Sequence, residues 1–220
     1  MAQEKTLKSA NRINLIVYLV LNFLFFATLS GLVSIKISEW DVLLKKWLAP
    51  EGIIIGILYS ISIVLEGVIS SDIKAVVVFW RLRSPLPGTR AFSDIATKDP
   101  RIDMNALSSL FSGKLPEEPR EQNAAWFSLY KKFGDAKIVL EAHKAFLLTR
   151  DLAALTIVLI SISIIGHIVF STGLAVGLIH LSILSGLYLI SAIASRNYGN
   201  RFVANVLVEA SRSQEANKGH

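Results

Sequence analysis

The chain has 220 residues, of which 52% are hydrophobic and 18% are charged, and its formal net charge is +6. Soluble domains carry about 25% charged residues and lack long uncharged stretches. This composition therefore argues against a soluble globular domain and favours a membrane protein. Cysteine is absent, which excludes disulfides, thiolate catalysis and cysteine-based zinc sites.

Four apolar runs are long enough to be considered as membrane spans, at residues 13–35, 53–69, 152–170 and 174–194. About 20 apolar residues in a helix cross the roughly 30 Å of hydrocarbon in a bilayer. The first run is too long for the apolar region of a signal peptide, so we expect it to remain as an anchor. We predict an all-α membrane protein, with four transmembrane helices in two hairpins and a helical cytoplasmic segment between them.

The distribution of positive charge predicts the orientation. Of the 23 lysines and arginines, only Lys36, Lys45 and Lys46 lie between the first two runs. Loops rich in lysine and arginine remain in the cytoplasm. We therefore expect a multi-pass protein of the cell inner membrane, with both termini in the cytoplasm. The same charges suit an anionic lipid surface, so we expect no direct nucleic-acid binding.

This orientation divides the chain into five parts. Residues 1–12 are a cytoplasmic tail, and residues 13–80 form the first hairpin, with spans at about 13–35 and 53–70 and an interfacial helix at about 39–49 outside. Residues 81–150 form the cytoplasmic helical segment. Residues 151–195 form the second hairpin, with spans at about 152–170 and 174–194 joined by a tight turn, and residues 196–220 are a cytoplasmic tail.

Capping signals predict three helices in the cytoplasmic segment. Asp103 can cap a helix over Met104–Phe111, and Pro119 can open one over Arg120–Phe133. A third, Asp135–Arg150, can run unbroken into the third span. His143 on this third helix is interpreted as a surface histidine.

The stretch WRLRSPLPGTRAFS follows the first hairpin and is rich in arginine and proline. We expect one helix of about 42 Å from Ile53 to Trp80, whose end projects beyond the inner face and packs on Asp135–Arg150. Pro85 stops this helix, and Pro87-Gly88 predicts a turn in which the glycine is free to take a positive φ. The stretch is either a helix stop with lipid-anchoring arginines or a rigid element that binds a partner or an anionic ligand. The binding residues would be Arg81, Arg83, Pro87, Gly88 and Arg90.

One carboxylate and two histidines lie within the predicted spans. Glu66 either pairs with a basic residue at the interface, contributes to a proton or cation pathway, or bonds between subunits, because intramembrane carboxylates are costly. His167 and His180 flank the tight turn at similar depth and can face each other. They either pack between helices or form a pH-sensitive or metal-binding pair, although two ligands are too few to hold a metal.

Four glycines in the second hairpin, Gly166, Gly173, Gly177 and Gly186, allow close approach between helices, and Gly173 and Gly177 form a GxxxG pattern. The close contact can lie within the hairpin or between protomers. No recognised catalytic motif or metal-binding motif is present, so we expect neither an enzyme nor a cofactor.

The sequences PLPGTRAF, KDPRID, REQNAAWFSLYKKF and HKAFLLTRD, followed by an apolar hairpin, resemble those of small four-span bacterial membrane proteins. The architecture is similar to that of the membrane subunit of Kiwa, an anti-phage defence system. The resemblance implies a homo-oligomeric sensor or scaffold in the inner membrane that works with a cytoplasmic protein partner. A pore-forming effector, and a small transporter or membrane enzyme, are the alternatives.

Overall fold

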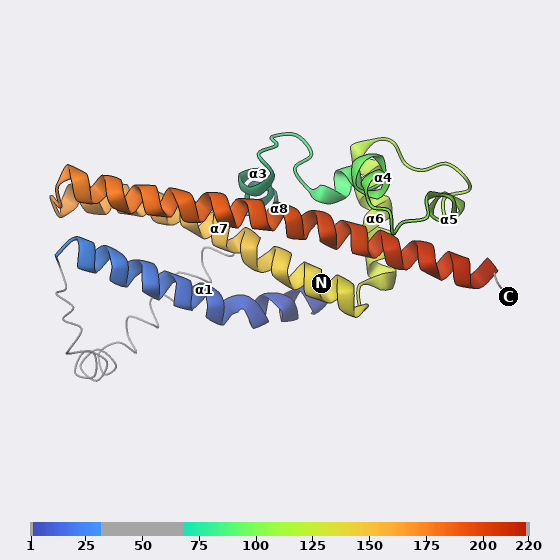
Figure 1. The fold of residues 1–220 in the computed structure, drawn as a ribbon, viewed down its shortest axis with the longest axis horizontal. Coiled ribbons are helices and arrows are strands. Elements are labelled where there is room, and N and C mark those ends of the chain that lie inside the picture. The colour runs from blue at the N-terminus through green and yellow to red at the C-terminus, as the bar shows by residue number, and fades with distance from the viewer. Residues whose placement is uncertain (1, 32–67, 219–220) are drawn as a thin grey trace. The chain divides into compact units, whose positions relative to one another are not determined.

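The computed structural model describes residues 2–31 and 68–218, and these residues are helical with short connections (Figure 1). The elements, in chain order, are α1 (Ala2–Leu29), α3 (Ser71–Phe79), the 3₁₀ turn η2 (Pro87–Arg90), the π-helical turn η3 (Ala91–Ile95), α4 (Ala96–Lys98), α5 (Met104–Ser109), α6 (Pro119–Phe133), α7 (Lys137–Val169) and α8 (Leu174–Lys218).

Three of the described helices contain segments long and apolar enough to cross a membrane. They are Ser9–Leu29, Lys137–Val169 and Leu174–Gln214. The predicted interfacial helix and, apart from residues 68–70, the predicted second span lie outside the described residues. The all-helical fold is confirmed for the described part of the chain. The second predicted span, at residues 53–70, and therefore the total of four spans, stay predictions.

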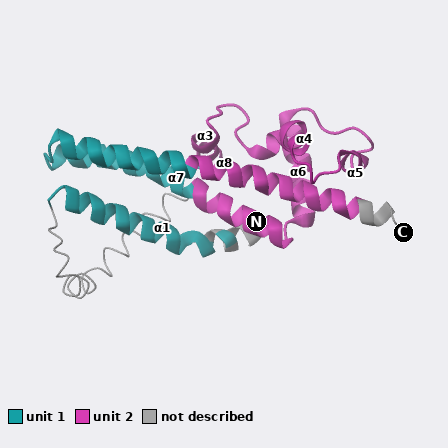
Figure 2. Cartoon of the chain, in the orientation of Figure 1, with its two compact units in different colours: residues 1–71, 151–191 teal, residues 72–150, 192–220 magenta. Residues whose placement is uncertain are grey.

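The chain forms two compact units (Figure 2). Unit 1 comprises residues 1–71 and 151–191, and unit 2 comprises residues 72–150 and 192–220. The long helices α7 and α8 contribute residues to both units. As predicted, the helix that starts before Arg150 continues into the third apolar run without interruption, because α7 spans Lys137–Val169.

Unit 1 joins α1 to the hairpin of α7 and α8. The hydroxyls of Tyr18 and Thr156 lie 2.7 Å apart, and Leu15 and Leu19 are buried on the same helix as Tyr18. The tight turn predicted at Ser171–Gly173 is present between Val169 and Leu174. Two of its residues have a positive φ, +48° at Ser171 and +83° at Gly173, which reverses the chain within four residues.

Unit 2 packs α3 and α6 against parts of α7 and α8. The ring of Phe202 on α8 stacks on His143 of α7 with centroids 4.2 Å apart, and it meets Trp126 and Tyr130 of α6 edge-on at 5.2 and 5.3 Å. Offset and edge-to-face aromatic pairs contribute about 0.5–1.5 kcal/mol beyond their buried area. The interpretation of His143 as a surface residue is therefore wrong, because its ring is buried and its Nδ1 lies 3.2 Å from the Tyr130 hydroxyl.

The predicted continuous helix from Ile53 to Trp80 is also wrong at its C-terminal end. Ile69 and Ser70 are not helical, and α3 begins at Ser71. Serine and aspartate compete for backbone hydrogen bonds and favour helix starts, which explains the break before Asp72. The expected packing of this segment on Asp135–Arg150 is confirmed, since the Phe79 and Phe146 rings are 6.2 Å apart.

Residues 196–218 of the predicted tail are helical, and they supply much of the core of unit 2. Seven apolar residues of the tail are buried: Phe202, Val203, Ala204, Val206, Leu207, Val208 and Ala210. Gly199 lets α8 approach its neighbours here. A Cβ at this position would come within 2.9 Å of the Phe79 ring and 3.0 Å of the Phe146 ring.

We predict that Gly199→Ala lowers the free energy of unfolding of unit 2 by about 1–2 kcal/mol. Overpacking costs about 1–3 kcal/mol, and the better helix propensity of alanine offsets up to about 1 kcal/mol of this. Thermal unfolding in detergent measures the change. Gly186→Ala is the matched control on the same helix, because nothing lies within 4 Å of its added Cβ. Equal stability of the two variants would contradict the packing of Gly199.

Candidate functional site

An exposed loop follows α3 and carries two of the predicted arginines. We call residues 80–84 the arginine loop. Arg81, Leu82 and Arg83 are exposed, and 88% of the Leu82 surface is accessible. The loop thus presents an apolar side chain between two guanidinium groups.

The backbone of the arginine loop is strained at both ends. Trp80 has φ +53° and Ser84 has φ +50°, in the left-handed region that non-glycine residues avoid. Two anchors hold this conformation. Arg196 donates its Nε–H to the Val78 carbonyl at 2.6 Å and places its guanidinium 3.4 Å from the Trp80 ring centroid. At the other end, the Thr89 hydroxyl lies 3.0 Å from the Ser84 carbonyl oxygen.

The predicted turn at Pro87-Gly88 is a 3₁₀ helix, in which Gly88 does not take the positive φ that is open to glycine. Both residues are buried in unit 2. A Cβ at Gly88 would overlap Oδ1 of Asn123 and come within 2.9 Å of Cε3 of Trp126. Gly88 is therefore needed for close approach to α6, and neither Pro87 nor Gly88 is presented to a partner.

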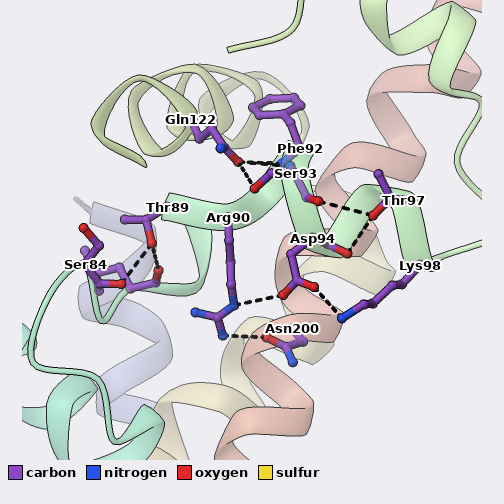
Figure 3. A network of polar contacts seen from close by, with 11 residues as sticks. Ser84, Thr89, Arg90, Phe92, Ser93, Asp94, Thr97, Lys98, Gln122 and Asn200 are labelled. Carbon is purple, nitrogen blue, oxygen red and sulfur yellow. Dashed lines mark hydrogen bonds and ion pairs between the residues drawn. The ribbon is translucent and has the colours of Figure 1, made fainter. Parts of the chain in front are cut away.

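Arg90 also points into the unit, unlike Arg81 and Arg83. Its Nη2 donates to Oδ1 of Asn200 at 3.2 Å, its Nε lies 3.5 Å from the Asp94 carboxylate, and its guanidinium lies 5.0 Å from the Phe79 ring centroid (Figure 3). Burial lowers the pKa of the Arg90 guanidinium, and the nearby positive charge of Arg81 lowers it further. Arg90 thus joins the η3 turn to α8.

Gln122 clamps the same turn from the opposite side. Its Oε1 accepts hydrogen bonds from the backbone N–H groups of Phe92 and Ser93, at 3.0 and 3.1 Å, and from the Ser93 hydroxyl (Figure 3). Its Nε2 donates to the Glu117 carbonyl at 2.7 Å. The side chain is only 2% exposed. Sequence reasoning missed this residue, since a lone glutamine on an amphipathic helix carries no signal of its role.

A charged pocket of about 410 Å³ lies between residues 94–101, which begin in the last part of η3, and residues 200–204 of α8. We call it the charged pocket. Its polar lining consists of Asp94, Lys98, Asp99, Arg101, Asn200 and Arg201, and its apolar lining consists of Ile95, Pro100 and Ala204.

Both carboxylates of the charged pocket are engaged by cations. Asp94 forms an ion pair with Lys98 in addition to its contact with Arg90. Asp99 accepts hydrogen bonds from Nε and Nη2 of Arg101 at 2.9 and 2.6 Å. These bonds lower the pKa of the Asp99 carboxyl, which therefore remains ionised at neutral pH.

His167 and His180 face each other in unit 1. Nε2 of His167 lies 3.0 Å from Nδ1 of His180, and Nδ1 of His167 lies 2.6 Å from the Thr172 hydroxyl. The rings of Phe25 and Phe26 lie 5.4 and 5.6 Å from the His180 ring. Within residues 2–31 and 68–218 there is no group of three metal-ligating side chains. The contact between the two histidines and the phenylalanine rings around His180 agree with packing between helices, and a pH-sensitive role of the pair stays a prediction.

The predicted helix-packing glycines have different surroundings. A Cβ at Gly166 would come within 2.9 Å of the Phe26 ring, and one at Gly177 would lie 3.5 Å from the His167 ring. Gly173 occupies the turn, and Gly186 has open space beside it. Gly166 therefore leaves room for the Phe26 ring of α1, whereas Gly177 leaves room for the His167 ring of α7. Glu66, the remaining predicted residue, lies outside the described residues.

No protein-family model, curated protein or solved structure matches this chain.

We predict that Gln122→Met destabilises unit 2 by about 1–3 kcal/mol, because the variant keeps the size of the side chain but leaves buried backbone N–H groups without an acceptor. Thermal unfolding and limited proteolysis within residues 84–101 measure the effect. Glu121→Gln, at the exposed neighbouring position, is the control and should behave as the wild type. A Gln122→Met protein as resistant as the control would refute the clamp.

Proposed function

We propose that the chain is an oligomeric scaffold or sensor subunit of the bacterial inner membrane, which docks a cytoplasmic protein partner through its central segment. The observation that carries this proposal is the arginine loop. Leu82 is almost fully accessible, yet the backbone on both sides of it is held by Arg196 and Thr89. A preorganised loop loses less conformational entropy on binding than a flexible one.

The topology in this proposal follows the distribution of positive charge. The apolar helices support a membrane location, and the excess of lysine and arginine in unit 2 and in both tails supports a cytoplasmic position for them. The proposal includes four spans, with residues 53–70 as the second one. Its setting in anti-phage defence and its homo-oligomeric state rest on the resemblance to the Kiwa membrane subunit.

Reporter fusions test the proposed topology. A reporter that is active only in the cytoplasm should give signal when fused to either terminus, and a reporter that is active only in the periplasm should not. Both fusions are compared at equal expression in the membrane fraction. A periplasmic signal at the C-terminus would refute the model of four spans with both ends inside.

The chemistry of the arginine loop indicates a partner surface with acidic residues around an apolar recess. Arg81 and Arg83 are exposed donors that pair well with carboxylates, and Leu82 between them would fill the recess. Arg90 takes no part in this surface, because it is built into the interior of unit 2.

We expect the double variant Arg81→Gln/Arg83→Gln, and separately Leu82→Asp, to lose the partner on co-purification from native membranes. Loss of charge complementarity or of a central apolar anchor weakens such contacts by about 2 kcal/mol or more. High salt should weaken the wild-type complex as well, because exposed charges are screened.

The matched control is Lys131→Gln/Lys132→Gln, which removes two exposed positive charges of unit 2 on α6. This variant should retain the partner. Arginine-loop variants that insert normally and retain the partner at both low and high salt would contradict docking. If the arginine-loop variants retain the partner but bind anionic vesicles more weakly than the wild type does, the loop is a lipid anchor instead.

A further inference from the structure

We propose that the charged pocket binds a small molecule through its phosphate group, at a site separate from the arginine loop. The pocket has a volume of about 410 Å³, within the 300–1,000 Å³ that is usual for small-molecule sites. It lies wholly within unit 2, between residues 94–101 and residues 200–204 of α8.

The hydrogen-bonding balance of the lining favours an anionic ligand. Both carboxylates are already paired with cations, because Asp94 contacts Lys98 and Arg90 while Asp99 accepts three hydrogen bonds from Arg101, two from its guanidinium and one from its backbone N–H. The donors are in excess. A lysine ammonium has three N–H groups and an arginine guanidinium has five, so neither is saturated by one carboxylate.

Arg201 and Asn200 add donors from the opposite wall. Arg201 is exposed and forms no ion pair within residues 2–31 and 68–218. Asn200 accepts from Arg90 through Oδ1, and its amide Nδ2 offers two N–H donors (Figure 3). A ligand between the walls would therefore meet N–H groups of Lys98, Arg101, Asn200 and Arg201.

Phosphate fits this set better than a carboxylate does. It offers three or more acceptor oxygens, and arginine guanidinium groups pair with it in a bidentate manner. The volume exceeds that of phosphate alone, and Ile95, Pro100 and Ala204 supply an apolar wall for the group attached to it. A soluble nucleotide and the headgroup of an anionic lipid share this chemistry.

Arg90 has a positioning role in this site. It does not line the pocket, but it bonds to Asp94 on one wall and to Asn200 on the other. The two walls are therefore held at a defined spacing before a ligand enters, and a preorganised site loses less entropy on binding.

The test uses the full chain purified in detergent, with three probes: inorganic phosphate, adenosine monophosphate and water-soluble dihexanoyl phosphatidic acid. Isothermal titration measures affinity, and thermal unfolding measures stabilisation of unit 2. We expect at least one probe to bind and to raise the unfolding temperature. Arg201→Gln should weaken this binding about tenfold or more, the usual effect of removing a charge-assisted hydrogen bond.

Arg201 is exposed, so Arg201→Gln should fold as the wild type does, and circular dichroism checks this. Lys131→Gln, which removes an exposed charge on α6 away from the pocket lining, is the control and should bind as the wild type does. Tighter binding of adenosine monophosphate than of phosphate indicates a soluble nucleotide. Tighter binding of dihexanoyl phosphatidic acid indicates a lipid headgroup.

Two results would overturn the proposal. One is that none of the three probes binds the wild-type protein. The other is that Arg201→Gln and Lys131→Gln weaken binding equally, because the effect would then reflect net charge and not the pocket.

Discussion

The aromatic packing around Phe202 is the interaction on which unit 2 depends. The Phe202 ring contacts His143 on α7 and both Trp126 and Tyr130 on α6, so it ties three helices together at one point. The indole N–H of Trp126 also donates to the Val203 carbonyl at 3.4 Å. These contacts fix the rotation of α6 about its own axis. The face of α6 that carries Gln122 is therefore directed at the η2 and η3 turns.

The remaining features of unit 2 follow from this orientation of α6. Gly88 allows η2 to lie against α6, and Gln122 bonds to the first residues of η3. Asp94 of η3 contacts Arg90, and Arg90 also donates a hydrogen bond to Asn200 on α8. The charged pocket and the arginine loop thus lie at the two ends of one short, well-anchored segment. A change in the aromatic contacts would alter both.

Much of the helical organisation could be predicted from local signals. Asp103 caps α5 by accepting from the backbone N–H groups of Asn105 and Ala106, and Pro119 opens α6, as its fixed φ favours. The Ser171–Gly173 turn and the continuity of α7 were predictable for the same reason, because each depends on residues close in sequence. The two histidines face each other because their spacing from that turn sets their depth.

The candidate site was less predictable, because it depends on contacts between distant residues. The sequence gives no reason to distinguish Arg81, Arg83 and Arg90. Only the fold shows that Arg81 and Arg83 are exposed and that the side chain of Arg90 is largely buried. The Pro87-Gly88 pair between Arg83 and Arg90 indicated a turn, whereas packing on α6 produces a 3₁₀ helix. The buried face of the C-terminal tail was missed because the distribution of positive charge predicted only a cytoplasmic location for the tail, and a location says nothing about packing.

The packing of α8 in unit 2 has a consequence for how its length can vary. Arg196, Gly199, Asn200 and Val203 each make a specific contact, and they recur at the three- and four-residue spacing of one helical face. Each residue turns an α-helix by about 100°. Inserting or deleting a single residue between Ser195 and Asn205 would rotate every later contact away from its partner. This stretch should therefore tolerate conservative replacement at many positions but no change in the number of residues.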